Sequence, residues 1–258
     1  MTSPVTVVIV TYRPFGAVVP LRALRQQSVK DFSTVLVAEI GAAAWGGDSD
    51  LVKGVDVVSP APIKFHALPH VLNIGIKRVK SGVVALLTDF GYPDRSWIEV
   101  LARVLETSGA PVVGGAKCSH GIADWQSCVP TGGAHACEGH DLLPIGLVQG
   151  MQNVQADHVR VFPFQHAFNL GNLAFRLSDA LAINGLDERF SGAHGYDDEN
   201  FVRRLVAHAK KHAVLAPGAV VHHYWPYSSG YKPLLKPEAR PWAMGLPNDQ
   251  LDRLVTEG

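Results

Sequence analysis

Three carboxylates in a row, Asp197, Asp198 and Glu199, follow a glycine-rich turn in the last third of the chain. Apolar residues after them recur at three- and four-residue spacing, which predicts a helix that begins at these acids. Acids in a first helical turn suit the helix dipole, and a cap needs only one of them. A carboxylate at such a junction also fits general acid–base chemistry, because burial and like charges shift its pKa there. The residues alone leave both interpretations open.

A second set of polar residues, Thr11, Glu39 and Asp89, stands at the ends of short and almost continuously apolar runs. Runs of this kind are typical of parallel strands that are buried on both faces. In parallel sheets, ligands bind beyond the carboxyl ends of the strands. We therefore expect these three side chains to meet at one binding edge.

Strand and helix patterns alternate through the first 115 residues, which predicts an α/β fold with a doubly wound, mostly parallel sheet and helices on both faces. The expected strands are 5–10, 34–38, 55–58, 83–87, 111–115, 169–175, 213–215 and 219–221. The expected helices include 71–80, one capped by Asp94 that ends before Gly109, and 178–183 capped by Ser178.

Composition bounds the function. The 258 residues carry 23 basic and 23 acidic side chains, so no positive field exists to hold a nucleic acid. The beginning of the sequence lacks the pattern of a signal peptide, and no apolar run reaches the length of a transmembrane segment. Three cysteines do not make a disulfide framework. These features predict a cytoplasmic protein with no transmembrane segment and no nucleic-acid partner.

The stretch 116–160 has no clear periodicity, and long irregular insertions are often functional loops. It contains a set of possible zinc ligands, but their spacing matches none of the familiar zinc sites, so a structural zinc is the weaker interpretation. The set comprises Cys118, His120, Cys128, His135, Cys137 and His140.

Several common signatures are missing. The sequence contains no glycine-rich dinucleotide fingerprint at a first helix, no P-loop and no Gly-x-Ser-x-Gly elbow. Dinucleotide oxidoreductases, P-loop NTPases and α/β-hydrolases are therefore disfavoured. A sugar nucleotidylyltransferase is also disfavoured, since no glycine-rich loop with Arg or Lys follows the first strand.

The remaining motifs resemble those of the inverting family-2 glycosyltransferases of GT-A fold, over roughly residues 5 to 225. Each motif alone is weakly specific, whereas their shared order and spacing is a strong signal for the family. In chain order they are VVIVTYR at 7–13, LRQQS at 24–28, NIG at 73–75 with SG at 81–82, LLTDFGYP at 86–93 followed by Trp97, GLDE at 185–188, GYDD at 195–198 and VH at 221–222.

The resemblance implies a nucleotide-sugar-dependent inverting transferase, with a UDP-sugar as the favoured donor and a glycan, lipid or protein hydroxyl as the acceptor. It also implies one GT-A-like domain over 1–225, with a nucleotide-binding half at 1–115 and an acceptor and catalytic half at 116–225. Residues 226–258 are expected to form an arm that packs on this domain.

By the same resemblance Asp198 is the general base, and the remaining site residues divide between donor and acceptor. The acceptor contacts are expected to be Asp197, Asn172 and Trp225, although core packing explains Trp225 equally well. The nucleotide contacts are expected to be Thr11, Tyr12, Arg13, Glu39, Asn73, Lys77 and Asp89.

The sequence departs from the family at the Asp-x-Asp segment. Aligned on Pro93, the two metal-facing positions hold Thr88 and Phe90, and only the middle acid, Asp89, remains. One interpretation is a Mn²⁺ or Mg²⁺ site made by Asp89 and His222, although His222 also fits an ordinary strand-end histidine. A metal-free transferase is the second interpretation. A non-catalytic nucleotide-sugar or glycan-binding protein is the third.

Overall fold

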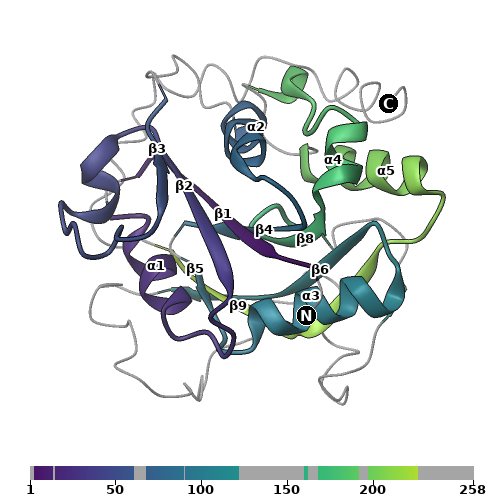
Figure 1. Ribbon diagram of the computed structural model, residues 1–258, viewed down its shortest axis with the longest axis horizontal. Coiled ribbons are helices and arrows are strands. Elements are labelled where there is room, and N and C mark those ends of the chain that lie inside the picture. The colour runs from purple at the N-terminus through teal and green to yellow at the C-terminus, as the bar shows by residue number, and fades with distance from the viewer. Residues whose placement is uncertain are drawn as a thin grey trace.

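A computed structural model describes residues 3–13, 15–60, 68–89, 91–121, 160–161, 168–191 and 197–225 (Figure 1). Most of the insertion, with the zinc-ligand candidates at 128–140, lies outside the described residues. The glycine-rich turn at 192–196 and the expected arm at 226–258 also lie outside them.

The described strands form one mixed sheet in the order β3-β2-β1-β4-β8-β6-β9-β5, with β7 paired to β9. The first four strands in this order are parallel to one another, as expected for the nucleotide-binding half. The strands are β1 (Val5–Thr11), β2 (Phe32–Ala38), β3 (Asp56–Val58), β4 (Val83–Thr88), β5 (Gly91–Pro93), β6 (Val112–Gly121), β7 (Arg160–Val161), β8 (Asn172–Arg176) and β9 (Val214–Trp225).

Helices cover both faces of this sheet (Figure 1). One face packs against α1 and α3, and the other against α2, α4 and α5, because successive residues of a strand point to opposite sides. The fully buried residues Val7 and Val8 of β1, for example, belong to different core clusters. The helices are α1 (Val18–Leu24), α2 (Leu68–Arg78), α3 (Trp97–Ser108), α4 (Leu177–Ala182) and α5 (Asp197–Ala209), with 3-10 turns at Gly41–Trp45 and Glu188–Phe190.

The predicted α/β class and the mostly parallel order of the first half are confirmed, but the second half differs from the prediction. Strand β8 lies between β4 and β6 and runs antiparallel to both. The strand expected at 111–115 continues to Gly121, and the two strands expected at 213–221 are one strand, β9. The β6–β9 register shifts after Gly115, which accommodates Pro217 without a break in the strand.

Two predicted helix caps were wrong. The helix α3 begins after Ser96, and Asp94 lies ahead of it with its backbone carbonyl accepting the N–H of Trp97 at 3.0 Å. The carboxylate of Asp94 turns instead to His222. Similarly, α4 begins after Arg176, so Ser178 lies inside its first turn.

Lys210 ends α5 in the left-handed conformation, with φ 52°. A side chain with a Cβ is strained there, whereas glycine is not. We expect Lys210→Gly to raise the free energy of unfolding by about 0.5–1 kcal/mol, measured by urea denaturation. The matched control is His208→Gly, in the exposed last turn of the same helix, which is expected to lower it by about 1 kcal/mol. Equal effects of the two substitutions would contradict the assignment.

Candidate functional site

A partly buried ion pair between Arg13 and Asp89 lies just beyond the ends of β1 and β4. Thr88 of β4 is the register partner of Val10, so Thr11 and Asp89 emerge side by side. Thr11 Oγ1 donates to Asp89 Oδ2 at 3.1 Å, and Arg13 Nη2 donates to Asp89 Oδ1 at 2.8 Å. Asp89 is only 4% exposed, and a buried charge is costly without partners. The guanidinium of Arg13 and the hydroxyl of Thr11 compensate the Asp89 charge.

Arg13 itself is fixed on three sides. Its backbone N–H donates to Thr11 Oγ1 at 3.1 Å, and its guanidinium lies over the ring of Tyr12, 5.1 Å from the centroid. The face of an aromatic ring attracts a cation. The Tyr12 ring and the Asp89 carboxylate therefore both fix the position of the Arg13 guanidinium. The Arg13 side chain is 21% exposed, which leaves this positive group at the surface of the sheet edge.

Glu39 lies beside this pair, because its backbone N–H donates to the Thr11 carbonyl at 3.3 Å. Burial raises the pKa of the Glu39 carboxyl, and the nearby His70 partly offsets that shift. Its Oε1 atom is buried and has no hydrogen-bond partner among the described residues. A buried acceptor of this kind is costly unless a ligand satisfies it.

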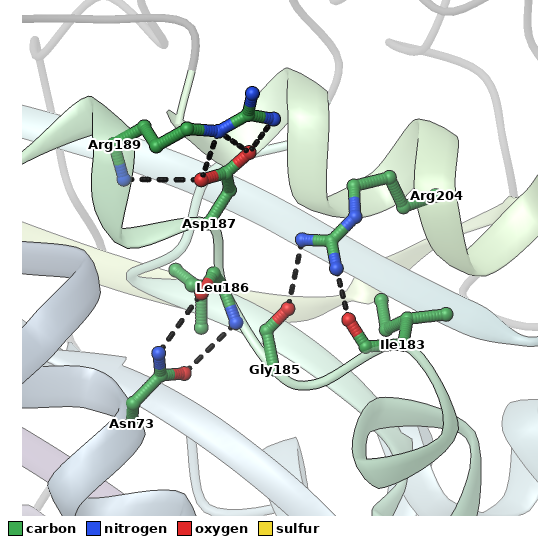
Figure 2. A network of polar contacts seen from close by, with 7 residues as sticks. All are labelled: Asn73, Ile183, Gly185, Leu186, Asp187, Arg189 and Arg204. Atoms are coloured by element: carbon green, nitrogen blue, oxygen red, sulfur yellow. Dashed lines mark hydrogen bonds and ion pairs between the residues drawn. The ribbon is translucent and has the colours of Figure 1, made fainter. Parts of the chain in front are cut away.

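Asn73 connects α2 to the turn at 183–187 (Figure 2). Its Nδ2 donates to the Leu186 carbonyl and to Glu188 Oε1, both at 2.9 Å, and its Oδ1 accepts the Leu186 N–H at 2.8 Å. Gly185 has φ 70°, and a Cβ there would meet Asn73 Oδ1 at 2.4 Å. Asn73 is 4% exposed, so its amide serves this turn in the structure, and a nucleotide contact stays a prediction.

Glu188 completes the connection. Its Oε2 lies 2.9 Å from His70 Nδ1, and hydrogen bonds from Asn73 and His70 lower the pKa of the Glu188 carboxyl. His70 lies in the first turn of α2 and also influences Glu39, so these side chains cluster at one edge of the sheet. Lys77 lies exposed near the end of α2, and its predicted nucleotide contact remains untested.

The other side of the same turn is held by α5 (Figure 2). Arg204 donates to the Gly185 carbonyl at 2.9 Å and to the Ile183 carbonyl. Arg189 pairs with Asp187 at 2.6 Å and lowers the pKa of that carboxyl. The turn therefore joins the helix of the first half, α2, to the helix that carries the three acids.

The three acids of α5 have different environments. Burial raises the pKa of Asp198 to about 6, with a further contribution from the neighbouring charge of Asp197. Asp198 Oδ1 also accepts the Glu199 N–H at 2.9 Å, which favours the charged form. Glu199 is committed to an ion pair with Arg203 at 2.6 Å. Asp198 is thus the acid whose protonation changes near neutral pH.

The expected metal ligands, Asp89 and His222, each have another partner. Asp89 binds Arg13 and Thr11, and His222 Nε2 lies 3.2 Å from Asp94 Oδ1. Within the part of the chain that the structure describes, no group of three or more His, Cys, Asp or Glu side chains is placed to hold a metal ion.

The expected acceptor contacts come from three different elements of the fold. Asp197 is the first residue of α5, and Trp225 is the last residue of β9. The structure describes the backbone of Trp225 but not its side chain. Asn172 is 1% exposed, accepts the indole N–H of Trp97 at 2.7 Å, and donates to the carbonyls of Ala116 and Ala219. These bonds hold the β6–β9 register shift, and an acceptor contact of Asn172 stays a prediction.

Three residues were not among the predicted site residues: His70, Arg204, and Asp94, which was expected only as a helix cap. Each acts through a partner that is distant in sequence or through a backbone carbonyl, so no local pattern marks it. Glu188 carried a signal, because it belongs to the GLDE motif.

Comparison with known proteins supports the fold. No family model and no curated protein matches the sequence. Among solved structures, the chain resembles GalNAc-T7 with UDP, GalNAc and Mn²⁺, with a TM-score of 0.63 and 13% identity over 86% of this chain and 44% of that one. It also resembles S. aureus TarS 1–349 in complex with UDP-GlcNAc, with a TM-score of 0.57 and 11% identity over 98% of this chain and 71% of that one.

Both neighbours are GT-A glycosyltransferases, and the chain therefore has the GT-A fold. The chain spans under half of the GalNAc-T7 structure. No helix among the described residues is long and apolar enough to cross a membrane.

Proposed function

We propose that this chain is an inverting glycosyltransferase that moves a sugar from a UDP-sugar to an acceptor hydroxyl, with Asp198 as the general base. The observation that supports the proposal most directly is the Asp198 carboxylate, whose pKa is raised to about 6 in the first turn of α5. A general base works best when its pKa lies near the working pH. Solved structures of similar fold contain UDP with GalNAc or UDP-GlcNAc, which supports a UDP-sugar as the proposed donor.

The chemical step is a single displacement. Above pH 6 the Asp198 carboxylate is ionised and accepts the proton of the acceptor hydroxyl. The acceptor oxygen forms a bond to the anomeric carbon from the face opposite the diphosphate, and the bond from that carbon to the phosphate oxygen breaks. UDP leaves with the electron pair, and the configuration at the anomeric carbon is inverted.

The donor is proposed to lie along the edge formed by Thr11, Tyr12, Arg13, Glu39 and Asp89. The buried Oε1 of Glu39 is suited to accept a hydrogen bond from the uracil N–H or from a ribose hydroxyl. Asp197 and Trp225 are proposed to contact the acceptor, which is a glycan, lipid or protein hydroxyl.

The proposal is tested by release of UDP from a panel of UDP-sugars, with and without candidate acceptors, and by the anomeric configuration of the product. Turnover in the wild type and its loss in Asp198→Asn are the expected results. Binding of UDP without turnover on any acceptor would favour a non-catalytic nucleotide-sugar-binding protein. Retention of configuration would exclude the inverting mechanism.

Glu39→Gln is expected to weaken UDP binding about five- to tenfold, since a hydrogen bond to a charged acceptor is stronger than one to a neutral acceptor. Calorimetric titration with UDP and GDP measures the effect. The matched control is Glu106→Gln on the exposed side of α3, which is expected to leave UDP affinity unchanged. Unchanged UDP affinity in Glu39→Gln would remove Glu39 from the nucleotide site.

A further inference from the structure

In the segment that aligns with a metal-binding motif, the one remaining carboxylate, Asp89, is paired with the positively charged side chain of Arg13. Asp89 places Oδ1 at 2.8 Å from Arg13 Nη2 and Oδ2 at 3.1 Å from Thr11 Oγ1, so both carboxylate oxygens are engaged. A divalent cation on the same carboxylate would meet the charge of the guanidinium at short range, where repulsion is strong.

The other expected ligand does not restore a cation site. His222 Nε2 faces Asp94 Oδ1 at 3.2 Å, and neither belongs to a group of three ligand side chains within the described ranges. Mn²⁺ and Mg²⁺ favour several oxygen or nitrogen ligands in a regular arrangement. The described residues therefore provide no set of ligands for a Mn²⁺ ion like the one in the GalNAc-T7 structure.

We infer that Arg13 replaces the divalent cation, and that this donor site binds the diphosphate of a nucleotide sugar without a metal. The inference rests on the proposed function. A guanidinium is always charged and presents N–H donors in a planar fork that matches phosphate oxygens, so it can hydrogen-bond a diphosphate while its Nη2 pairs with Asp89. Preorganised charge of this kind stabilises the leaving group as its negative charge develops.

Asp89 acts as a positioning residue in this arrangement. Thr11 orients its carboxylate, the carboxylate holds Nη2 of Arg13, and the ring of Tyr12 supports the guanidinium from one face. The Arg13 side chain is 21% exposed, so its guanidinium is accessible from the sheet edge where the donor is proposed to bind. The Asp89 carboxylate therefore orients the Arg13 guanidinium instead of coordinating a metal ion.

The test is calorimetric titration of the full chain with UDP, once with EDTA and once with Mn²⁺. We expect wild-type affinities that agree within about twofold, and a loss of about ten- to a hundredfold in Arg13→Gln in both buffers. Arg22→Gln, on the exposed side of α1, is the matched control and is expected to bind UDP as the wild type does.

Two further variants separate a binding defect from a folding defect. Arg13→Gln leaves the buried Asp89 charge without its guanidinium, whereas the double variant Arg13→Gln/Asp89→Asn contains neither charge. The double variant is expected to melt close to the wild-type temperature and still to bind UDP weakly. Asp89→Asn alone is expected to keep EDTA-resistant binding within about tenfold, because the guanidinium remains.

Each alternative result has a definite meaning. Wild-type binding that appears only with Mn²⁺, or is lost in EDTA, would overturn the metal-free site and leave the proposed transferase intact. Tight UDP binding by a folded Arg13→Gln protein would also overturn it. No binding of UDP in either buffer would overturn the proposed function, and this inference with it.

Discussion

Asp198→Asn is expected to abolish sugar transfer and, at pH 7, to make the folded protein more stable. Loss of a general base lowers the rate by about 10²–10⁴. The stability gain has a separate cause: burial and Asp197 disfavour the charged carboxylate, whose pKa is about 6 in the folded state against 3.8 for an unperturbed Asp carboxyl. Such a shift corresponds to on the order of 2–3 kcal/mol at most, and asparagine has no charge to bury.

The pH dependence of this effect has a definite sign. Between pH 3.8 and about 6 the folded state holds the Asp198 proton more tightly than the unfolded state does. The stabilisation from the protonated group is fully present below the lower value and is lost as the pH rises through about 6. The unfolding free energies of wild type and Asp198→Asn, measured with urea, should therefore be similar below pH 4 and differ most at pH 7.

Activity should follow the same ionisation. The acidic limb of kcat/KM is expected near pH 6 in the wild type. Asp197→Asn is the matched variant, because the charge of Asp197 contributes to the raised pKa. Because Asp197 is also proposed to contact the acceptor, this variant should raise KM for the acceptor but keep turnover at saturating acceptor, with an acidic limb at lower pH. A stable Asp198→Asn protein with full transfer activity would refute the assignment of the base, and lower stability at pH 7 would refute the origin of the pKa shift.

Asn73→Ala is expected to lower the free energy of unfolding by about 2–5 kcal/mol, which is large for a single substitution. It removes the partners of the N–H and carbonyl groups of Leu186, which is only 2% exposed, and one donor to Glu188. Buried backbone groups without partners carry their full desolvation cost. Urea denaturation at pH 7 measures the loss.

Two further variants test whether the loss of stability in Asn73→Ala comes from its hydrogen bonds. Lys77→Ala, one turn further along the exposed side of α2, should change stability by less than about 0.5 kcal/mol. Asn73→Asp preserves the shape but places a carboxylate against the Leu186 carbonyl and Glu188, and should be nearly as destabilising as alanine at pH 7. A loss below about 1 kcal/mol for Asn73→Ala would show that water replaces these bonds.

The fold of the first half was predictable because its strands are buried on both faces. The apolar runs that became β1, β2 and β4 contain few polar residues, so type and length follow from composition. The antiparallel placement of β8 was not predictable, since a strand of five residues with only three apolar ones carries no mark of its neighbours. Pro217 suggested a break, but the β6–β9 register shift keeps β9 continuous.

For the site, the sequence predicted which residues stand at the strand ends, but it did not predict their partners. The sequence placed Thr11, Glu39 and Asp89 at strand ends, and the structure shows all three there. It did not reveal that Arg13 binds Asp89, 76 residues away, or that Asn73 binds Leu186, 113 residues away. Spacing along the chain identifies which groups are suited to chemistry, whereas the fold determines which of them are already occupied by one another.

The position of β8 bears on how the chain can be divided. Strand β4 pairs with β1 on one side and with β8 on the other, so a segment from beyond residue 170 closes the middle of the sheet. A polypeptide that stops at residue 115 ends inside β6 and leaves β4 as a bare edge, with open backbone groups and an apolar surface that favour aggregation. The two halves that the sequence predicts therefore share one sheet, and we expect that neither folds as an independent module.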